Sequence, residues 1–168
     1  MNAAKAIELC YARTMRKYAE LGEGVVIRPW QSLRDDEWHT DDAKGDRRFP
    51  CLDIRCSPPA DREDAGIFFD TPCFMTCAHK ADADKDHALI SAMFEEVERV
   101  ALLLFAQWWN QSLVDNQFAY WAGQWTKELG ATFSLGGITN GEPQQPAEED
   151  NLLTIGLSQI VAFSRTDI

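Results

Sequence analysis

The sequence lacks the features that would mark a membrane protein, a secreted protein or a nucleic-acid-binding protein. No apolar run approaches the roughly 20 residues that a membrane-spanning helix needs, and Glu8 stands where a signal peptide would have its apolar centre. Basic residues are few, because 16 Lys and Arg against 27 Asp and Glu give a net charge of -11. We therefore expect a chain that has no membrane partner, is made and kept in the cytoplasm, and repels the phosphates of nucleic acid.

The chain also lacks a recognisable catalytic or cofactor-binding motif. The segment 82–86 resembles the start of a calcium loop, but His87 and Met93 stand where that loop needs its glycine and its bidentate glutamate. The pair Gly136 and Gly137 has neither the lysine nor the strand-to-helix context of a phosphate loop. No Ser, His and Asp set can be argued from spacing. We predict no catalytic residue, no metal site and no cofactor, and we expect that the protein is not an enzyme.

Cysteine is present, but in an odd number that does not suggest a disulfide-rich secreted scaffold. The five residues are Cys10, Cys51, Cys56, Cys73 and Cys77. A predicted hairpin centred near residues 64–65 brings Cys56 close to Cys73 and Cys51 close to Cys77. Four zinc ligands would not converge there, because Cys51 and Cys56 point to opposite faces of their strand. Buried reduced thiols and a cross-strand disulfide remain open, and a small thiol- or zinc-dependent enzyme is the alternative to a structural role.

Length and composition favour one folded domain spanning residues 1–168, because 45 % hydrophobic content over 168 residues can form a substantial core. Apolar residues recur every three or four positions in two segments, which predicts helices, and five other segments have the alternation or the residue types of strands. We predict an α+β fold, with a small, mostly antiparallel sheet on which an N-terminal helix and one long helix pack. The predicted helices are residues 3–21 and 84–109, and the predicted strands are residues 25–28, 49–56, 67–77, 131–138 and 151–164.

Several local features of these elements are predicted as well. Pro72 lacks the donor that a sheet ladder needs, so the strand 67–77 should lie at an edge or carry a bulge. Asp82 or Asp84 should cap the long helix. Residues 100–109 are apolar nearly all round, which suggests burial against a neighbouring subunit.

Two loops are candidates for contact with a partner. The polar segment 31–48 is long for a compact domain, and Trp30, Trp38 and the pair Arg47 and Arg48 are of the types favoured at interface centres. The alternative is that both tryptophans cover the edge of the domain's own core. The Gly-, Pro-, Gln- and Glu-rich segment 136–150 is expected to be a flexible loop that serves as an arm of an assembly or lines its lumen.

The order of predicted elements resembles that of the tail terminator and tail-completion proteins of tailed bacteriophages. The resemblance rests on the helix 3–21, the strand 25–30, the hairpin 49–77, the helix 84–109 and the final alternating strand 152–164. It covers nearly the whole chain through pattern and order rather than through a motif. The segment 110–130 is longer than expected for that family.

The resemblance implies a virion protein of the tail or neck, assembled in the host cytoplasm. Copies of the chain would form a ring, commonly a hexamer, that caps the tail tube and joins it to the head-tail connector, while DNA crosses an acidic lumen without specific binding. The implied contact residues lie on loops: Trp30, Trp38, Arg47, Arg48, Glu142, Glu148, Glu149 and Asp150. A monomeric adaptor that binds one partner through the tryptophan-rich surface is a further alternative.

Overall fold

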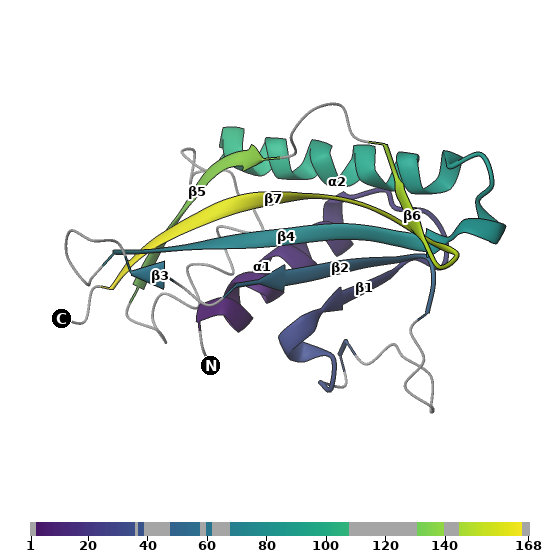
Figure 1. Ribbon diagram of the computed structural model, residues 1–168. Coiled ribbons are helices and arrows are strands. Elements are labelled where there is room, and N and C mark those ends of the chain that lie inside the picture. The colour runs from purple at the N-terminus through teal and green to yellow at the C-terminus, as the bar shows by residue number, and fades with distance from the viewer. Residues whose placement is uncertain are drawn as a thin grey trace.

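A computed structural model of the protein describes residues 3–35, 37–38, 48–57, 60–61, 68–107, 131–139 and 145–165. The elements are α1 (Ala3–Tyr18), β1 (Val26–Pro29), η1 (Trp30–Ser32), β2 (Cys51–Cys56), β3 (Ala60–Asp61), β4 (Phe68–Lys80), η2 (Ala81–Ala83), α2 (Ala88–Gln107), β5 (Ala131–Thr139), β6 (Ala147–Glu149) and β7 (Leu152–Arg165). The predicted α+β class is confirmed, with an N-terminal helix and one longer helix beside a mostly antiparallel sheet (Figure 1).

The sheet is organised around two long antiparallel strands, β4 and β7. Its order is β1-β2-β4-β7-β5, and β3 and β6 add short pairings to β4 and β7. Only the β1–β2 pair is parallel among the described pairings. The predicted hairpin register is confirmed at Cys56, which lies opposite Cys73, and is one residue out at Cys51, which lies opposite Ala78 rather than Cys77.

In the described part of the chain, both helices pack on one face of the sheet. The helix α1 contacts β1 and β2, whereas α2 contacts β4, β5 and β7. Alternation along each strand then determines which side chains enter the core between the helices and the sheet. The strand residues in this core include Leu52, Ile54, Met75, Cys77, Ile155 and Leu157. The opposite face is open at Phe74 and Ile160, whose side chains remain exposed.

The long helix α2 begins where an aspartate satisfies its free backbone donors. The carboxylate of Asp84 accepts hydrogen bonds from the backbone N–H groups of Leu89 (3.1 Å) and Ile90 (2.9 Å), as a helix cap requires. The prediction that Asp82 or Asp84 caps the helix is therefore confirmed for Asp84. The helix itself begins four residues later than predicted, at Ala88.

Of the two alternatives predicted for the strand that contains Pro72, the edge position is wrong, because β4 is the central strand of the order β1-β2-β4-β7-β5. The predicted bulge is consistent with the register, which shifts by one residue from Cys56 opposite Cys73 to Ala60 opposite Asp70. The structure shows why proline is tolerated there. Pro72 lies beside Ser57, past the end of β2 at Cys56 and before β3 begins at Ala60. The Pro72 carbonyl accepts a hydrogen bond from the Ser57 N–H at 3.1 Å. The missing donor thus falls where the neighbouring ladder is already interrupted.

The predicted flexible loop over residues 136–150 is wrong at both of its ends. The strand β5 continues to Thr139, and β6 pairs with β7 through a two-residue turn. The turn residues Asp150 and Asn151 have positive φ angles of 50° and 61°, which is the geometry of a tight type I′ hairpin. Asn151 also holds η2 in place, because its backbone and side-chain oxygens accept hydrogen bonds from Ala81 N (2.9 Å) and Asp82 N (2.9 Å).

Candidate functional site

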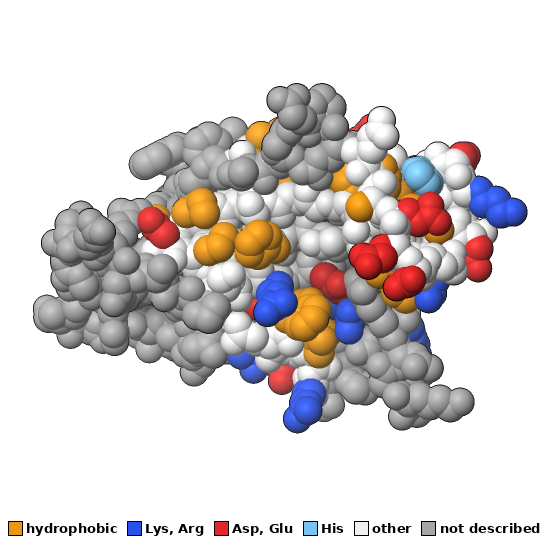
Figure 2. Space-filling view, viewed as in Figure 1, with side chains coloured by type: hydrophobic (Ala, Val, Ile, Leu, Met, Phe, Trp, Pro, Cys, Tyr) orange, Lys and Arg blue, Asp and Glu red, His pale blue; other side chains and the backbone are white. Residues whose placement is uncertain are grey.

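The face of the sheet opposite the helices is the candidate site, and we call it the open face. It contains a groove of about 520 Å³, lined by Trp30, Asp53, Arg55, Ser57, Phe74, Thr76 and Thr154. Trp30 and Phe74 are 46 % and 44 % exposed, although burying such rings would be favourable. The guanidinium of Arg55 lies 5.0 Å from the centre of the Trp30 ring. Figure 2 shows hydrophobic side chains gathered in the middle of this face, with basic side chains beside them.

A buried ion pair supports the open face beneath Trp30 and Arg55. Arg28 on β1 lies opposite Asp53 on β2, and their side chains approach to 3.0 Å. Both side chains are about nine-tenths buried, with 9 % and 11 % exposed, so their charges are weakly screened. The pair ties the sheet's only described parallel strand to its neighbour and gives the groove a rigid floor.

An acidic hairpin borders the open face where β6 and β7 meet. Glu148, Glu149 and Asp150 are exposed there, as the loop residues predicted for partner contact should be. A second hollow, of about 360 Å³, is lined by Phe49, Lys80, Ala147, Glu149, Asp150, Leu152 and Thr154. Thr154 lines both hollows, so the groove and the acidic hairpin form one continuous surface. Acidic side chains gather toward this end in Figure 2.

The two tryptophans predicted to contact a partner have different environments. Trp30 is exposed on the open face, whereas Trp38 is 1 % exposed and belongs to the core. The prediction is therefore corrected for Trp38, whose side chain is not accessible to a partner, and the alternative that it covers the domain's own core holds for this residue. Its ring lies under the guanidinium of Arg16, 3.7 Å from the ring centre.

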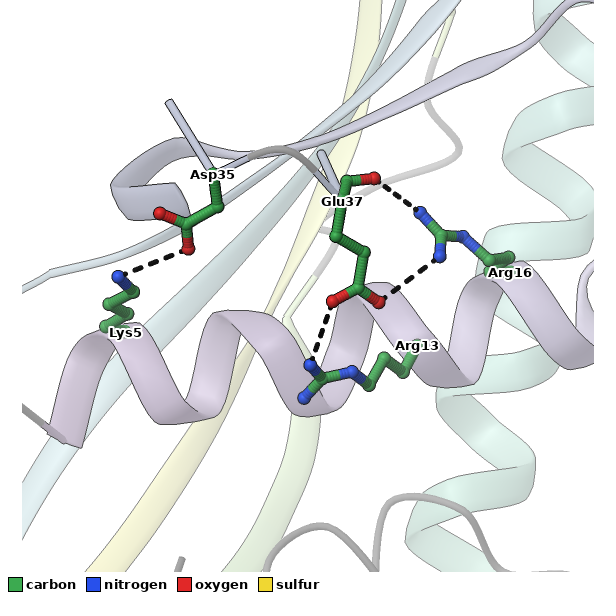
Figure 3. Close-up of polar contacts among 5 residues, drawn as sticks. All are labelled: Lys5, Arg13, Arg16, Asp35 and Glu37. Atoms are coloured by element: carbon green, nitrogen blue, oxygen red, sulfur yellow. Dashed lines mark hydrogen bonds and ion pairs between the residues drawn. The ribbon is translucent and has the colours of Figure 1, made fainter. Parts of the chain in front are cut away.

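The segment that carries Trp38 is joined to α1 by ion pairs. Figure 3 shows Lys5 reaching Asp35 at 3.3 Å, and Arg13 and Arg16 reaching Glu37 at 3.2 and 3.4 Å. Each partly exposed pair contributes little by itself. Together they join three basic residues of α1 to the segment that carries Trp38. Trp38, which lies in the polar segment predicted to contact a partner, therefore belongs to the domain's own core.

The remaining predicted contact residues divide into those that the structure describes and those that it does not. Arg48 is described and exposed. Arg47 and Glu142 lie outside the described residues. On α2, Leu102 and Leu103 are 50 % and 38 % exposed, so the apolar end of this helix does present hydrophobic surface. The neighbouring subunit predicted to cover it remains a prediction.

Sequence reasoning missed a buried carboxylate, Glu8 on α1, which is 0 % exposed. Its oxygens accept hydrogen bonds from Gln31 N (2.8 Å), Gln31 Nε2 (3.2 Å) and Cys56 N (2.9 Å). Burial raises the pKa of Glu8, although these hydrogen bonds and the charge of Arg55 oppose the shift. Glu8 therefore joins α1, η1 and β2 at one buried point. The sequence contains a signal for the burial of Glu8. It lies three positions before Tyr11 and seven before Met15, which is the spacing of residues on one helix face, and both of these residues are buried.

The five cysteines are all buried, and none of them forms a disulfide in this structure. Burial raises the pKa of the Cys73 thiol well above its ordinary value and that of Cys77 to about 12. A thiol that stays protonated is a weak nucleophile, so the geometry does not favour a thiol enzyme built on either of these two residues. Among the described residues, no three His, Cys, Asp or Glu side chains are grouped as a metal site would require. No helix in the described ranges has the length and hydrophobicity needed to span a membrane.

The groove residues Asp53, Arg55 and Phe74 were not predicted as site residues, although strand alternation contains the signal. Asp53 and Arg55 occupy the face of β2 opposite Leu52 and Ile54, and Phe74 follows Cys73 on β4. An aromatic residue on the polar side of a strand indicates an exposed ring. A scan of the chain against protein-family models and a search of curated proteins found no match.

Proposed function

We propose that this protein is a structural component of a tailed-bacteriophage virion, which forms a ring that caps the tail tube and joins it to the head connector. The observation that carries the proposal is the order of elements: a helix, a short strand, an antiparallel pair, a long helix and two antiparallel strands. This is the order on which the resemblance to tail terminator proteins rests. The partners would be further copies of the chain, the tail tube protein and the head-tail connector protein.

The open face supports an assembly role because it combines a rigid sheet with an exposed apolar patch. Trp30, Phe74 and Ile160 are 46 %, 44 % and 38 % exposed on it. Aromatic residues of this kind are enriched at the centres of protein interfaces. The adjacent hairpin concentrates three acidic residues, Glu148, Glu149 and Asp150, of a chain whose net charge is -11. Such a surface would let DNA pass through a ring without adhering.

The test is the mass of the native protein in solution, measured by light scattering after gel filtration, alone and after mixing with tail tubes. We expect a discrete assembly near six times the 19.0 kDa chain mass, either at once or on meeting tubes. A chain that stays monomeric in both conditions would contradict the proposal. Binding to a single partner by such a monomer would favour the adaptor alternative, which the same exposed groove could serve.

A pair of variants then locates the contact. Trp30→Ala removes an exposed ring from the open face, and we expect it to weaken assembly or tube binding at least tenfold, as interface aromatics commonly do. Leu89→Ala is the matched control, because Leu89 is 54 % exposed on α2, away from the open face. Equal binding by both variants would remove Trp30 from the contact. Trp38→Ala would not serve, because loss of this buried ring would destabilise the core.

A further inference from the structure

Two of the buried cysteines face each other across the central strands. Cys56, the last residue of β2, lies opposite Cys73 on β4. The next pair along the ladder, Ser57 and Pro72, is joined by a hydrogen bond of 3.1 Å from the Ser57 N–H to the Pro72 carbonyl. Hydrogen-bonded and non-hydrogen-bonded pairs alternate in antiparallel sheets, so Cys56 and Cys73 form a non-hydrogen-bonded pair, whose Cα atoms are typically about 4.5 Å apart. That spacing lies within the range of about 4.4–6.8 Å found for disulfides.

The side chains share one face as well as one register position. Both thiols belong to the core between the sheet and the helices, with 4 % and 0 % exposure, and they lie within hydrogen-bonding reach of each other. The backbone N–H of Cys56 points away from β4 and donates to Glu8 at 2.9 Å, as expected for a residue in a non-hydrogen-bonded pair. Glu8 thus fixes the end of β2 in the position that keeps Cys56 beside Cys73.

We propose that Cys56 and Cys73 are an oxidation site, at which a cross-strand disulfide forms between β2 and β4. The oxidant is a low-molecular-weight disulfide such as oxidised glutathione. The Cys56 sulfur attacks one glutathione sulfur, which breaks the glutathione disulfide, releases one reduced glutathione and leaves a mixed disulfide. The Cys73 thiol then loses its proton, and its sulfur attacks the adjacent Cys56 sulfur and releases the second reduced glutathione; burial of Cys73 makes this step slow but does not prevent it. The protein loses two electrons and two protons, and the two glutathione thiols carry both. Cys56 is assigned the first step because its side chain is 4 % exposed, whereas that of Cys73 is 0 % exposed.

The other strand cysteines form no equivalent pair. Cys51 lies opposite Ala78, and Cys77 lies opposite Leu52. Because successive residues of a strand point to opposite faces, the Cys51 and Cys77 side chains leave the sheet on opposite sides. A bond between them would require β2 to slip by one residue, which would turn Leu52 and Ile54 out of the core. The structure therefore assigns oxidation to one pair of strand cysteines and not to the other.

The disulfide would close the chain segment between β2 and β4. Such a link limits the freedom of the unfolded chain more than that of a sheet already paired in this register. We expect the oxidised protein to melt roughly 5–10 °C higher than the reduced protein, from the usual effect of closing a loop of this length in a chain of this size. Reduction should return the melting temperature to its starting value.

The decisive experiment maps the bond in the wild-type chain. The folded protein is incubated with oxidised glutathione, remaining thiols are alkylated at once, and the chain is digested. Trypsin places Cys56 in the peptide 56–62 and both Cys73 and Cys77 in the peptide 63–80, and chymotrypsin then cuts after Phe74 to separate the last two. We expect the linked peptides to contain Cys56 and Cys73. A bond that uses Cys10, Cys51 or Cys77 instead, or no bond under native conditions, would overturn the proposal.

Two variants provide the matched comparison. Cys73→Ala should abolish the oxidised species, whereas Cys77→Ala, also fully buried on the same face of β4, should still form it and show the same upward shift in melting temperature. A disulfide that forms equally in both variants would refute the assignment. If either variant fails to fold, the peptide map of the wild-type chain still decides the question, because it needs no substitution.

Discussion

The two faces of the sheet are built from alternating residues of the same strands, but they have different roles. The face toward the helices contains the core side chains of β2, β4 and β7, together with Glu8 and the cysteine pair. The open face presents Trp30 and Phe74 above the buried pair of Arg28 and Asp53. The comparison shows that the pleat of the strands separates buried core side chains from exposed ones, so neighbouring residues in one strand should respond to substitution in different ways.

The largest expected contrast is between Met75 and Phe74, which are adjacent on β4 and point to opposite faces. Met75 is 0 % exposed, so Met75→Ala should lower the free energy of unfolding by about 2–5 kcal/mol through lost burial and a cavity. Phe74→Ala should cost less than about 1 kcal/mol, because the ring is already 44 % exposed. Urea unfolding monitored by circular dichroism measures both values. Equal losses would show that the open face is covered in solution.

A smaller effect on the free energy of unfolding is expected at Gly156 on β7. This residue lies on the open face, but close to the backbone of β4. A Cβ atom at this position would lie 2.7 Å from the Met75 carbonyl oxygen and 3.1 Å from the Thr76 Cα, and these backbone atoms cannot move away cheaply. Gly156→Ala should therefore force β4 and β7 apart and cost about 1–3 kcal/mol. Unfolding in urea measures this cost. A neutral Gly156→Ala variant would mean that these two strands are less tightly paired than the register indicates.

The pH dependence of the free energy of unfolding tests the role of Glu8 on the face of the sheet that the helices cover. Because the pKa of Glu8 in the folded chain is raised above its ordinary value of 4.5, the folded state holds this proton more tightly than the unfolded chain does. The corresponding stability is fully present below pH 4.5 and is lost as the pH rises through the raised pKa. Glu8→Gln cannot titrate, so the wild type should lose stability relative to this variant over that window.

Urea unfolding of both proteins between pH 4 and 8 measures this difference. The control is Glu95→Gln, which removes a carboxylate that is exposed on α2 and should leave the pH dependence of the wild type unchanged. The Glu8 effect should be smaller than those at Met75 and Gly156, because hydrogen bonds from Gln31 and Cys56 offset part of the cost of burying the charge. Parallel curves for the wild type and Glu8→Gln would contradict the raised pKa.

Local patterns predicted the parts of this fold that are set by local chemistry. Strand alternation and the hairpin centre placed Cys56 opposite Cys73, and the free donors of a helix start required a cap such as Asp84. The central position of β4 could not be predicted in this way, because it depends on β7, which is distant in the sequence: Lys80 pairs with Leu152 and Phe68 with Ser164. Pro72 suggested that β4 is an edge strand. The strand β4 lacks a continuous neighbour only next to Pro72, between the end of β2 at Cys56 and the start of β3 at Ala60.

The candidate site was harder to predict because it depends on which helix covers which face. Trp30 and Trp38 are alike in the sequence, and only the tertiary contacts of the second segment with α1, which include the ion pairs of Asp35 and Glu37, distinguish the buried ring from the exposed one. Likewise, alternation places Phe74 on the face opposite Cys73 and Met75, but its ring stays exposed only because both helices pack on the other face. The exposure of the acidic residues 148–150 could be predicted from the sequence, because consecutive charged residues are exposed in almost any fold.

The smallest effect on stability is expected at the acidic hairpin. Variants of this hairpin test whether it contacts a partner. Glu148→Gln combined with Glu149→Gln changes two exposed side chains, so the free energy of unfolding should move by no more than about 0.5 kcal/mol. If the hairpin contacts a partner, the same variant should bind tail tubes more weakly and with less dependence on salt, because fewer charges remain to be screened. A control variant, Glu23→Gln with Glu95→Gln, removes two exposed charges elsewhere. Equal loss of binding in both variants would point to net charge alone, whereas loss confined to the hairpin variant would locate the contact at the end of the open face.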